Sequence, residues 1–178
     1  VEEIYVYMQT NYGTSVTPFY TTLALWVGGI VLVALMKVKV DYEDDEFKDA
    51  TEHQKYMGRA LLFLAMGQLQ ALVVVLGDLY ILKIDCTHPF MLWLAAAITS
   101  FVFTLFIYTL VLTFGDLGKA IAVVMIVLQI AGSGGTYPIE LLPEFFQNVY
   151  LYFPFPYAIN AMREAISGLY QCDYAVFL

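Results

Sequence analysis

The feature that most constrains this fold is the clustering of charged residues, which leaves long apolar stretches between the clusters. No Asp, Glu, Lys or Arg occurs from Ile4 to Met36. Within this stretch, residues 17–36 are long enough to cross about 30 Å of hydrocarbon as a helix, at about 1.5 Å per residue. Three further stretches carry at most one charged residue each: residues 60–82, 90–115 and 119–135. We therefore expect an all-α, polytopic membrane helix bundle that forms a single membrane domain over residues 1–178.

Composition excludes several other classes of protein. Hydrophobic residues make up 61% of the chain and charged residues 13%, against about 45–50% and about 25% in an average soluble domain. The net charge of −8, with no basic stripe, argues against nucleic-acid binding. No G-x-S-x-G, H-E-x-x-H or Walker sequence is present, and His53 and His88 fall on opposite sides of the expected membrane. We predict no enzyme active site, no metal site and no cofactor.

Lysine and arginine set the expected orientation, because they concentrate on the cytoplasmic side of membrane proteins. If residues 37–59 form a cytoplasmic loop, the other side keeps only Lys83 and Arg163. The cytoplasmic side then holds Lys37, Lys39, Lys48, Lys55, Arg59 and Lys119. Residues 1–16, the end of an extracellular region, would lie outside. The acidic run at residues 41–49 is either a solvated loop or a docking surface, and residues 46–59 could form a short surface helix.

The last predicted span is interrupted by glycines. From Ala120 a helix would rise only about 20 Å before it meets the run Gly132-Ser133-Gly134-Gly135. Prolines and aromatic residues are frequent from there to residue 168, so a plain spanning helix is not expected. Broken backbone at membrane depth must be sheltered by protein or face water. Residues 136–168 therefore predict a re-entrant or interfacial hairpin of two short helices.

Each predicted span has one face suited to close helix packing, with small and polar residues three or four positions apart. The polar side chains of interest inside the spans are Gln70, Asp78 and Gln129. Bundle packing and a substrate pathway both account for these faces. Asp78 is either an ion or proton site, or an interfacial carboxylate that is hydrogen-bonded to a neighbour or to water. Arg163 is a candidate partner on the same side.

Two cysteines, Cys86 and Cys172, both fall on the outer side in this topology. A disulfide between them requires an oxidising compartment and a short distance between their Cα atoms. The sequence leaves this disulfide and two free thiols both open.

A family resemblance rests on two segments, GSGGTYPIELLP from Gly132 to Pro143 and PFPYAINAMREAISG from Pro154 to Gly168. Four other stretches fit the same pattern in order: residues 11–14, 25–28, 70–79 and 114–120. Together they resemble the C-terminal half of ABC-2-type permeases, and more narrowly the phage infection protein (Pip/YhgE) family of bacterial membrane proteins. The resemblance covers nearly the whole chain, and its specific part is the segment from the glycines to Arg163.

The resemblance implies a fold with an N-terminal membrane helix, a large extracellular region and several further helices. This chain would begin at the end of the extracellular region and lack the final membrane helix. The resemblance also implies an external re-entrant hairpin, in which glycines allow tight turns, prolines set two short helices, and Arg163 with Glu164 forms a polar end. The motif residues are Gly132, Gly134, Gly135, Pro138, Pro143, Pro154, Tyr157, Asn160, Arg163, Glu164 and Gly168.

Two functions follow from the resemblance as expectations. The first is an ABC-2-like transmembrane module of an export or envelope machine in the bacterial cell membrane. It would act as a homodimer or larger assembly in the lipid bilayer, with a separate ATP-binding subunit or secretion machinery. The second is a membrane anchor or scaffold without transport, which presents an extracellular domain as a phage receptor or a component of type VII secretion. Permease-like form does not by itself imply permease function.

Overall fold

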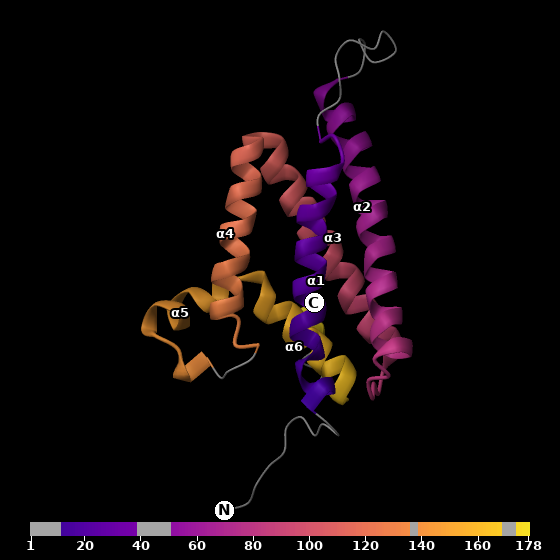
Figure 1. The fold of residues 1–178 in the computed structure, drawn as a ribbon, viewed down its shortest axis with the longest axis vertical. Helices are drawn as coiled ribbons and strands as arrows, with labels where there is room; N and C mark the ends of the chain where they lie inside the picture. The colour runs from indigo at the N-terminus through magenta and orange to yellow at the C-terminus, as the bar shows by residue number, and fades with distance from the viewer. Residues whose placement is uncertain (1–11, 39–50, 136–138, 169–173) are drawn as a thin grey trace, which may run out of the picture.

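The computed structural model describes residues 12–38, 51–135, 139–168 and 174–178, and these contain helices and connecting segments but no strand. Four long helices run alternately up and down the long axis of the molecule (Figure 1). They are α1 (Tyr12–Leu35), α2 (Glu52–Leu76) with its π-helical continuation η2 (Gly77–Ile81), α3 (Pro89–Phe114) and α4 (Asp116–Gly132). The predicted helical bundle is thereby confirmed.

Three helical segments are long and apolar enough to cross a membrane, namely Tyr12–Leu35, His53–Ile81 and Pro89–Phe114. The fourth long helix, α4, has 17 residues, which corresponds to a rise of about 25 Å. It ends at Gly132, at the first glycine of the run that predicted its interruption. The fold is therefore a membrane helix bundle in which α4 is shorter than the other three long helices.

Two helix starts differ from the predicted spans. Helix α1 begins at Tyr12, more than a turn before residue 17, and Pro18 lies inside it rather than in its first turn. The hydroxyls of Thr17 and Thr22 donate hydrogen bonds to the carbonyls of Gly13 and Pro18, at 2.9 and 2.8 Å. These bonds attach side chains to the helix on both sides of the proline, which has no N–H of its own to donate.

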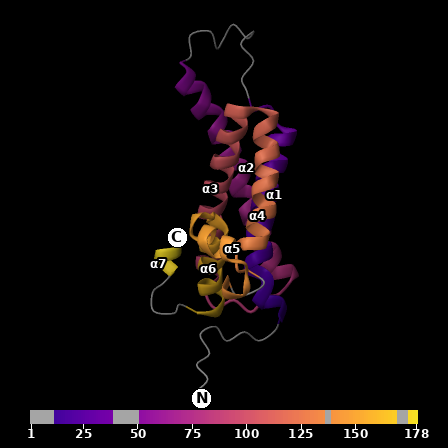
Figure 2. The ribbon, with the colours of Figure 1, turned by 90° about the vertical axis from the view of Figure 1, so that its left-hand side faces the viewer.

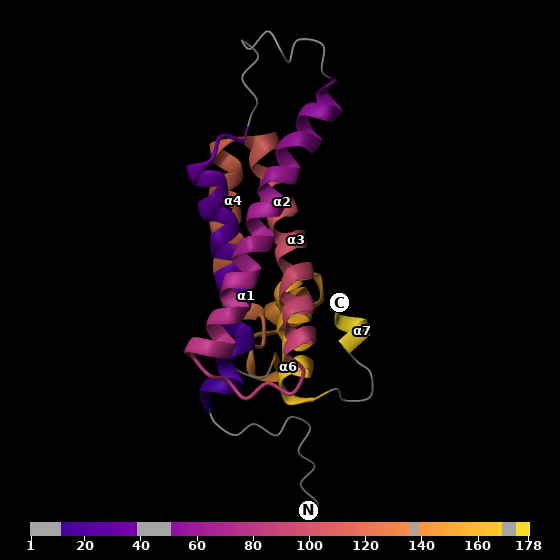
Figure 3. The same ribbon diagram turned by 90° about the vertical axis from the view of Figure 1, so that its right-hand side faces the viewer.

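Helix α2 begins inside the predicted cytoplasmic loop at residues 37–59. Thr51 and Gln54 form a capping box, because each side chain bonds the other residue's backbone N–H. From this cap the helix continues without a break to Leu76. The sequence predicted that residues 46–59 could form a short surface helix. From Glu52 onward these residues belong to α2 instead, and residues 46–50 lie outside the described part of the chain. The upper end of α2 projects beyond α3 and α4 (Figure 3).

Short helices fill the lower half of the fold, at the end where α4 stops (Figure 2). They are η3 (Ile139–Leu141), α5 (Glu144–Val149), η4 (Tyr150–Tyr152), α6 (Pro154–Ser167) and α7 (Tyr174–Phe177). Helix α6 packs on α1 and α3. Its last carbonyls, which have no partner within the helix, accept hydrogen bonds from the loop before α3. The backbone N–H groups of Thr87 and His88 donate to Ile166 and Ala165, each at 3.0 Å.

A single glycine joins α3 to α4. Gly115 has φ of +62°, which favours glycine. One turn later, Gly118 lies against the backbone of α3. A Cβ atom there would be 2.8 Å from the carbonyl carbon of Leu110 and 2.9 Å from the Cα atom of Val111. The two helices can approach this closely only because Gly118 has no side chain.

Replacing Gly118 with alanine is expected to lower the free energy of unfolding by about 1–3 kcal/mol, because the obstructing atoms belong to the backbone and cannot rotate away. Gly58 provides the matched control, since a Cβ atom at this position in α2 meets nothing within 4 Å. Gly58→Ala should stabilise the protein by about 0.5–1 kcal/mol through helix propensity. Thermal unfolding in detergent measures both variants, and equal effects at the two positions would contradict the close approach of α3 and α4.

Candidate functional site

The polar contact most relevant to function joins α1 to the end of α2. The Thr21 hydroxyl donates a 2.6 Å hydrogen bond to the Asp78 carboxylate. Asp78 lies in η2 and is only 7% exposed. The N–H of Leu82 donates to the carbonyl of Gly77 at 3.0 Å, which closes the π-turn. A π-turn is a common way for a helix to end, and this one carries the buried carboxylate that forms the centre of the candidate site.

A row of threonines on α1 leads to Asp78. Thr14, Thr17 and Thr21 are all buried and lie three and four residues apart, on one helix face. Thr21 was not among the partners expected for Asp78 from the sequence. Threonines at helical spacing in the first apolar stretch were the signal that could have identified this row.

Two glutamines of α2 face different neighbours. The Gln70 side chain donates to the carbonyl of Ala24 in α1 at 3.1 Å and lies against Gly28. The Gln68 side chain donates to the carbonyl of Ala97 in α3 at 2.9 Å. Gln70 therefore continues the polar contact between α1 and α2 beyond Asp78, toward the middle of the bundle.

The small residues of the predicted packing faces lie between helices. Gly67 packs against Thr104 and Ser100 of α3, and the Ser100 hydroxyl donates to the carbonyl of Gly67 at 2.8 Å. In α4, Ala122 is buried and its carbonyl accepts a 3.2 Å hydrogen bond from the Trp26 indole. These contacts agree with the bundle-packing interpretation of the small-residue faces.

Arg163 contacts the glycine turn. Its guanidinium donates to the carbonyl of Gly135 at 3.0 Å and to the Asn160 side chain at 3.4 Å. It thereby ties α6 to the segment that follows α4, while Asp78 has Thr21 as its hydrogen-bond donor. Glu164, which the resemblance places with Arg163 at the polar end of the second short helix, is buried in α6.

The prolines and glycines of the predicted motif set the ends of short helices. Pro143 precedes α5 as its N-cap, and Pro154 is the first residue of α6. Gly134 and Gly168 have φ of +63° and +105°, so both occupy backbone conformations that favour glycine. The Tyr157 hydroxyl donates to the carbonyl of Leu151 at 3.0 Å. Pro138 lies outside the described residues.

Cys86 lies in the loop between η2 and α3. Burial raises the pKa of its thiol, which donates to the carbonyl of Ala165 at 3.6 Å. A raised pKa keeps the thiol protonated and weakly nucleophilic. Cys86 is a free cysteine in this structure. Cys172 falls outside the described residues, so the sequence's two alternatives, a disulfide and two free thiols, are not tested at that end.

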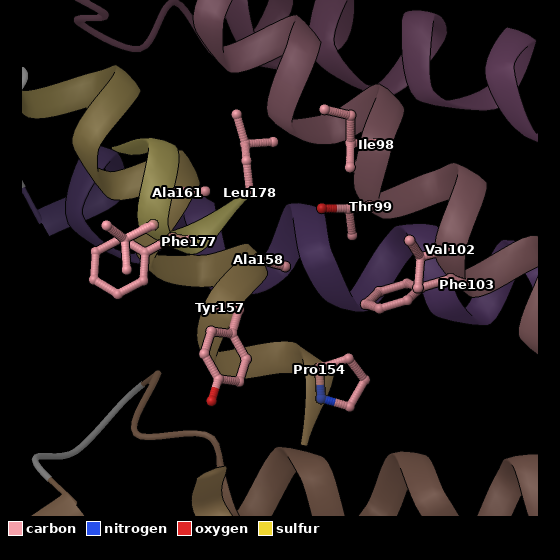
Figure 4. Close-up of a pocket in the computed structure, with 11 residues that line it drawn as sticks. Ile98, Thr99, Val102, Phe103, Pro154, Tyr157, Ala158, Ala161, Phe177 and Leu178 are labelled. Carbon is pink, nitrogen blue, oxygen red and sulfur yellow. The ribbon is translucent and has the colours of Figure 1, made fainter. Parts of the chain in front are cut away.

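An apolar groove of about 250 Å³ opens between α3, α6 and the end of the chain (Figure 4). Ile98, Val102 and Phe103 of α3 face Ala158 and Ala161 of α6 across it.

A second pocket, of about 330 Å³, lies between the end of α1 and the α3–α4 junction. Lys119 forms a 2.9 Å ion pair with Asp116 at this junction, and this contact lowers the pKa of Asp116. The described part of the chain brings together no group of three or more residues that could hold a metal ion.

Comparison with known proteins places these features in a family. Residues 53–175 match the ABC-2 family transporter protein family. The chain is also 32% identical, over 158 residues, to the uncharacterized protein YhgE of Bacillus subtilis (strain 168). That alignment covers 89% of this chain and 20% of YhgE, so the chain spans about a fifth of the length of this curated relative. No solved structure matches the chain.

The resemblance predicted from the glycine and proline segments is thus confirmed. The match begins near the start of α2 and extends through α6 into α7. It therefore includes Asp78, the glycine turn and Arg163. Together with the apolar helices, it shows that the chain belongs to the ABC-2 transporter family and is a multi-pass membrane domain of that family.

Proposed function

We propose that this chain is the transmembrane module of a bacterial export or envelope machine that is driven by a separate ATP-binding subunit. The family match supports a transport module. The observation that carries the proposal is the buried carboxylate of Asp78 in a π-turn, because ionisable groups inside membrane helices are costly and mark functional pathways. The module acts in the cell membrane as two copies, with the N-terminal end of α1 and the short helices on the outside.

Helix α2 supports a mechanical connection between the two sides of the membrane. It runs from the cap at Thr51, on the proposed cytoplasmic side, to the π-turn that holds Asp78. Near its start, the Tyr56 hydroxyl lies 2.8 Å from the Thr109 hydroxyl, and the Tyr108 hydroxyl donates to the carbonyl of Tyr56 at 3.2 Å. These bonds fix α2 to α3 about one turn after the start of α2. A displacement at the cytoplasmic end is therefore transmitted along one continuous helix to the site.

The acidic run at residues 41–49 precedes this helix in the sequence and is proposed as the docking surface. Its excess of Asp and Glu repels anionic lipid headgroups and attracts a basic partner surface. The chain itself has no Walker sequence, so the nucleotide site belongs to the partner.

Deleting residues 41–49 is expected to weaken co-purification of the ATP-binding subunit, because the charged surface that it docks on is removed. The measurement is the recovery of this subunit with the tagged, detergent-extracted membrane protein. Substituting the exposed residues Leu61 and Leu69 of α2 by alanine supplies the control, since these residues lie on the helix within the candidate membrane span. Unchanged recovery after the deletion would contradict docking at this surface.

A non-transporting anchor is the second candidate, and the length of YhgE favours it. Most of that relative lies outside the aligned part, so a membrane module of this kind can serve to hold a much larger region. In this case the chain would be stable and inserted in the membrane with no ATP-binding partner. If no ATP-binding subunit is recovered with the protein that retains residues 41–49, this result supports the anchor.

A further inference from the structure

The second pocket described above lies at the end of the bundle where α1 stops and α3 turns into α4 (Figure 1). It has a volume of about 330 Å³. The buried residues Val33 and Val111 form part of its lining. Lys37 and Lys119 bring two cationic side chains to the same pocket from distant parts of the chain. The pocket therefore has room for a ligand group and is lined by both apolar and positively charged residues.

The charges at the pocket favour an anion. Beside the two lysines, Asp116 brings a negative charge and forms a 2.9 Å ion pair with Lys119. The Asp116 side chain is 95% exposed, against 37% for that of Lys119, and exposed pairs of this kind contribute little on their own. An ammonium group has three N–H donors, so Lys119 can bond a second acceptor while it keeps Asp116. The acidic run begins at Asp41, beyond the residues that line the pocket.

The pocket lies at the depth of lipid headgroups. Helix α1 has 24 residues, so its length of about 36 Å exceeds the about 30 Å of hydrocarbon. Its last residue, Leu35, lines the pocket and therefore reaches the membrane interface. In the orientation proposed above, on which this step rests, the interface is the cytoplasmic one. Basic pockets between membrane helices on that side bind anionic lipid headgroups.

Exposed apolar side chains lead from the pocket toward the middle of the membrane. On α1, Val31 and Leu35 are exposed and lie four residues apart, on one helix face. On α4, Val123 is exposed and lies one turn after Lys119, on the same face. Helices α1 and α4 pack side by side (Figure 3). Their exposed residues offer an apolar surface that an acyl chain can use and a free phosphate ion cannot.

We propose that this pocket binds the phosphate headgroup of an anionic phospholipid. Lys37 and Lys119 donate to the phosphate oxygens, because charge-assisted hydrogen bonds from lysine suit this group. The acyl chains lie along the exposed residues of α1 and α4. A lipid held in this way connects the end of α1 to the α3–α4 turn and stabilises the folded bundle, since it binds the folded state alone.

Native mass spectrometry of the full chain in detergent tests the site, because it counts bound lipids as the lipid concentration rises. The probe is phosphatidylglycerol, and the comparison ligands are phosphatidylcholine with the same acyl chains and inorganic phosphate. We expect phosphatidylglycerol to bind more tightly than either. Combined Lys37→Gln and Lys119→Gln substitutions should weaken its binding by about tenfold or more, the scale of a lost hydrogen bond to a charged group.

The matched control combines Lys55→Gln with Arg59→Gln. It removes the same amount of charge from the same end of the bundle, but from residues of α2 that do not line the pocket. Phosphatidylglycerol affinity should be unchanged in this variant. A second measurement needs no variant: phosphatidylglycerol with a photoreactive acyl chain, in lipid nanodiscs with the unmodified protein, should label α1 near Val31 and α4 near Val123.

Three results would overturn the proposal. The first is equal phosphatidylglycerol affinity in the lysine variant and in the control, and if the lysine variant then loses the ATP-binding subunit, the pocket docks a protein instead. The second is inorganic phosphate that binds as tightly as phosphatidylglycerol, which would make the ligand a free anion. The third is photolabelling confined to other helices. The lipid measurements use neither cargo nor an ATP-binding subunit, so their failure is distinguishable from a failure of the transport proposal.

Discussion

Replacing Trp26 with alanine is expected to lower the free energy of unfolding by about 3–5 kcal/mol. Trp26 is completely buried and lies at the meeting point of four helices. Its ring centroid is 4.9 Å from that of Phe103 in α3 and 5.7 Å from that of Phe155 in α6. Its indole N–H donates to the carbonyl of Ala122 in α4 at 3.2 Å.

The cost arises from the cavity and not from exposure to water. In lipid, apolar side chains gain little by leaving the solvent, so dispersion contacts between closely packed groups hold the helices together. Alanine would remove the contacts with both phenylalanine rings and the hydrogen bond from the indole to the Ala122 carbonyl. The cavity would border α1, α3, α4 and α6 at once. The loss of one side chain therefore weakens the packing of four helices, which explains the large decrease in the free energy of unfolding.

Two variants separate the contributions to this cost. Trp26→Phe keeps an aromatic ring and loses the N–H, and should destabilise the protein by about 0.5–1.5 kcal/mol, the net value of one hydrogen bond, because the Ala122 carbonyl lies inside α4 and keeps its intrahelical partner. Val31→Ala, on the exposed face of the same helix, should have little effect. Unfolding in bicelles, followed by a method that reports the free energy, measures all three. Equal stabilities of the Trp26→Ala and Val31→Ala variants would show that the four helices do not meet at Trp26.

Local signals in the sequence predict the elements whose ends are determined locally. The glycine run predicted the interruption of the last span, which ends at Gly132 rather than at residue 135. The resemblance assigned Pro154 to the second short helix, and α6 begins there. Glycine and proline fix these ends through their own backbone geometry, which no distant contact can change. The close packing of Gly67 and Ala122 between helices was likewise predictable, because small residues at helical spacing have few roles other than close packing in a membrane.

Other features depend on contacts between distant parts of the chain. The start of α2 was missed because the capping box at Thr51 lies within a charged region that resembles a loop. The π-turn at Gly77–Ile81 has no sequence pattern of its own, and it brings Asp78 to a threonine 57 residues away. The position of the re-entrant hairpin relative to the membrane stays a prediction.

Replacing Thr21 with valine is expected to destabilise the protein by about 2–3 kcal/mol, the upper range for a hydrogen bond to a charged group. Valine has nearly the shape of threonine but leaves the Asp78 carboxylate without the Thr21 hydroxyl. The 2.6 Å distance falls in the range of about 2.5–2.7 Å typical of charge-assisted O–H···O⁻ hydrogen bonds. Hydrogen bonds between membrane helices average only about 0.6 kcal/mol in double-mutant cycles, with a maximum near 1.7 kcal/mol.

We therefore expect a coupling free energy between Thr21 and Asp78 of about 1.7 kcal/mol, the maximum for such hydrogen bonds, and not the average of about 0.6 kcal/mol. A double-mutant cycle of Thr21→Val, Asp78→Ala and the combined variant measures it from free energies of unfolding, because alanine removes the acceptor of the hydrogen bond. Thr113→Val supplies the control, because the Thr113 hydroxyl is exposed and bonds only within its own helix, to Thr109. A coupling energy near zero would show that the carboxylate does not depend on this hydroxyl.

Export by the Asp78→Asn variant addresses the role of the charge itself. Asparagine keeps an oxygen that accepts the Thr21 hydrogen bond, so the α1–α2 contact is preserved while the negative charge is removed. We expect normal membrane insertion and a loss of export, because an ionisable group buried inside a membrane helix is costly and marks a place where a cation, a proton or a polar cargo passes. If export is unaffected while insertion remains normal, Asp78 serves helix packing alone and the anchor becomes the better account of the module.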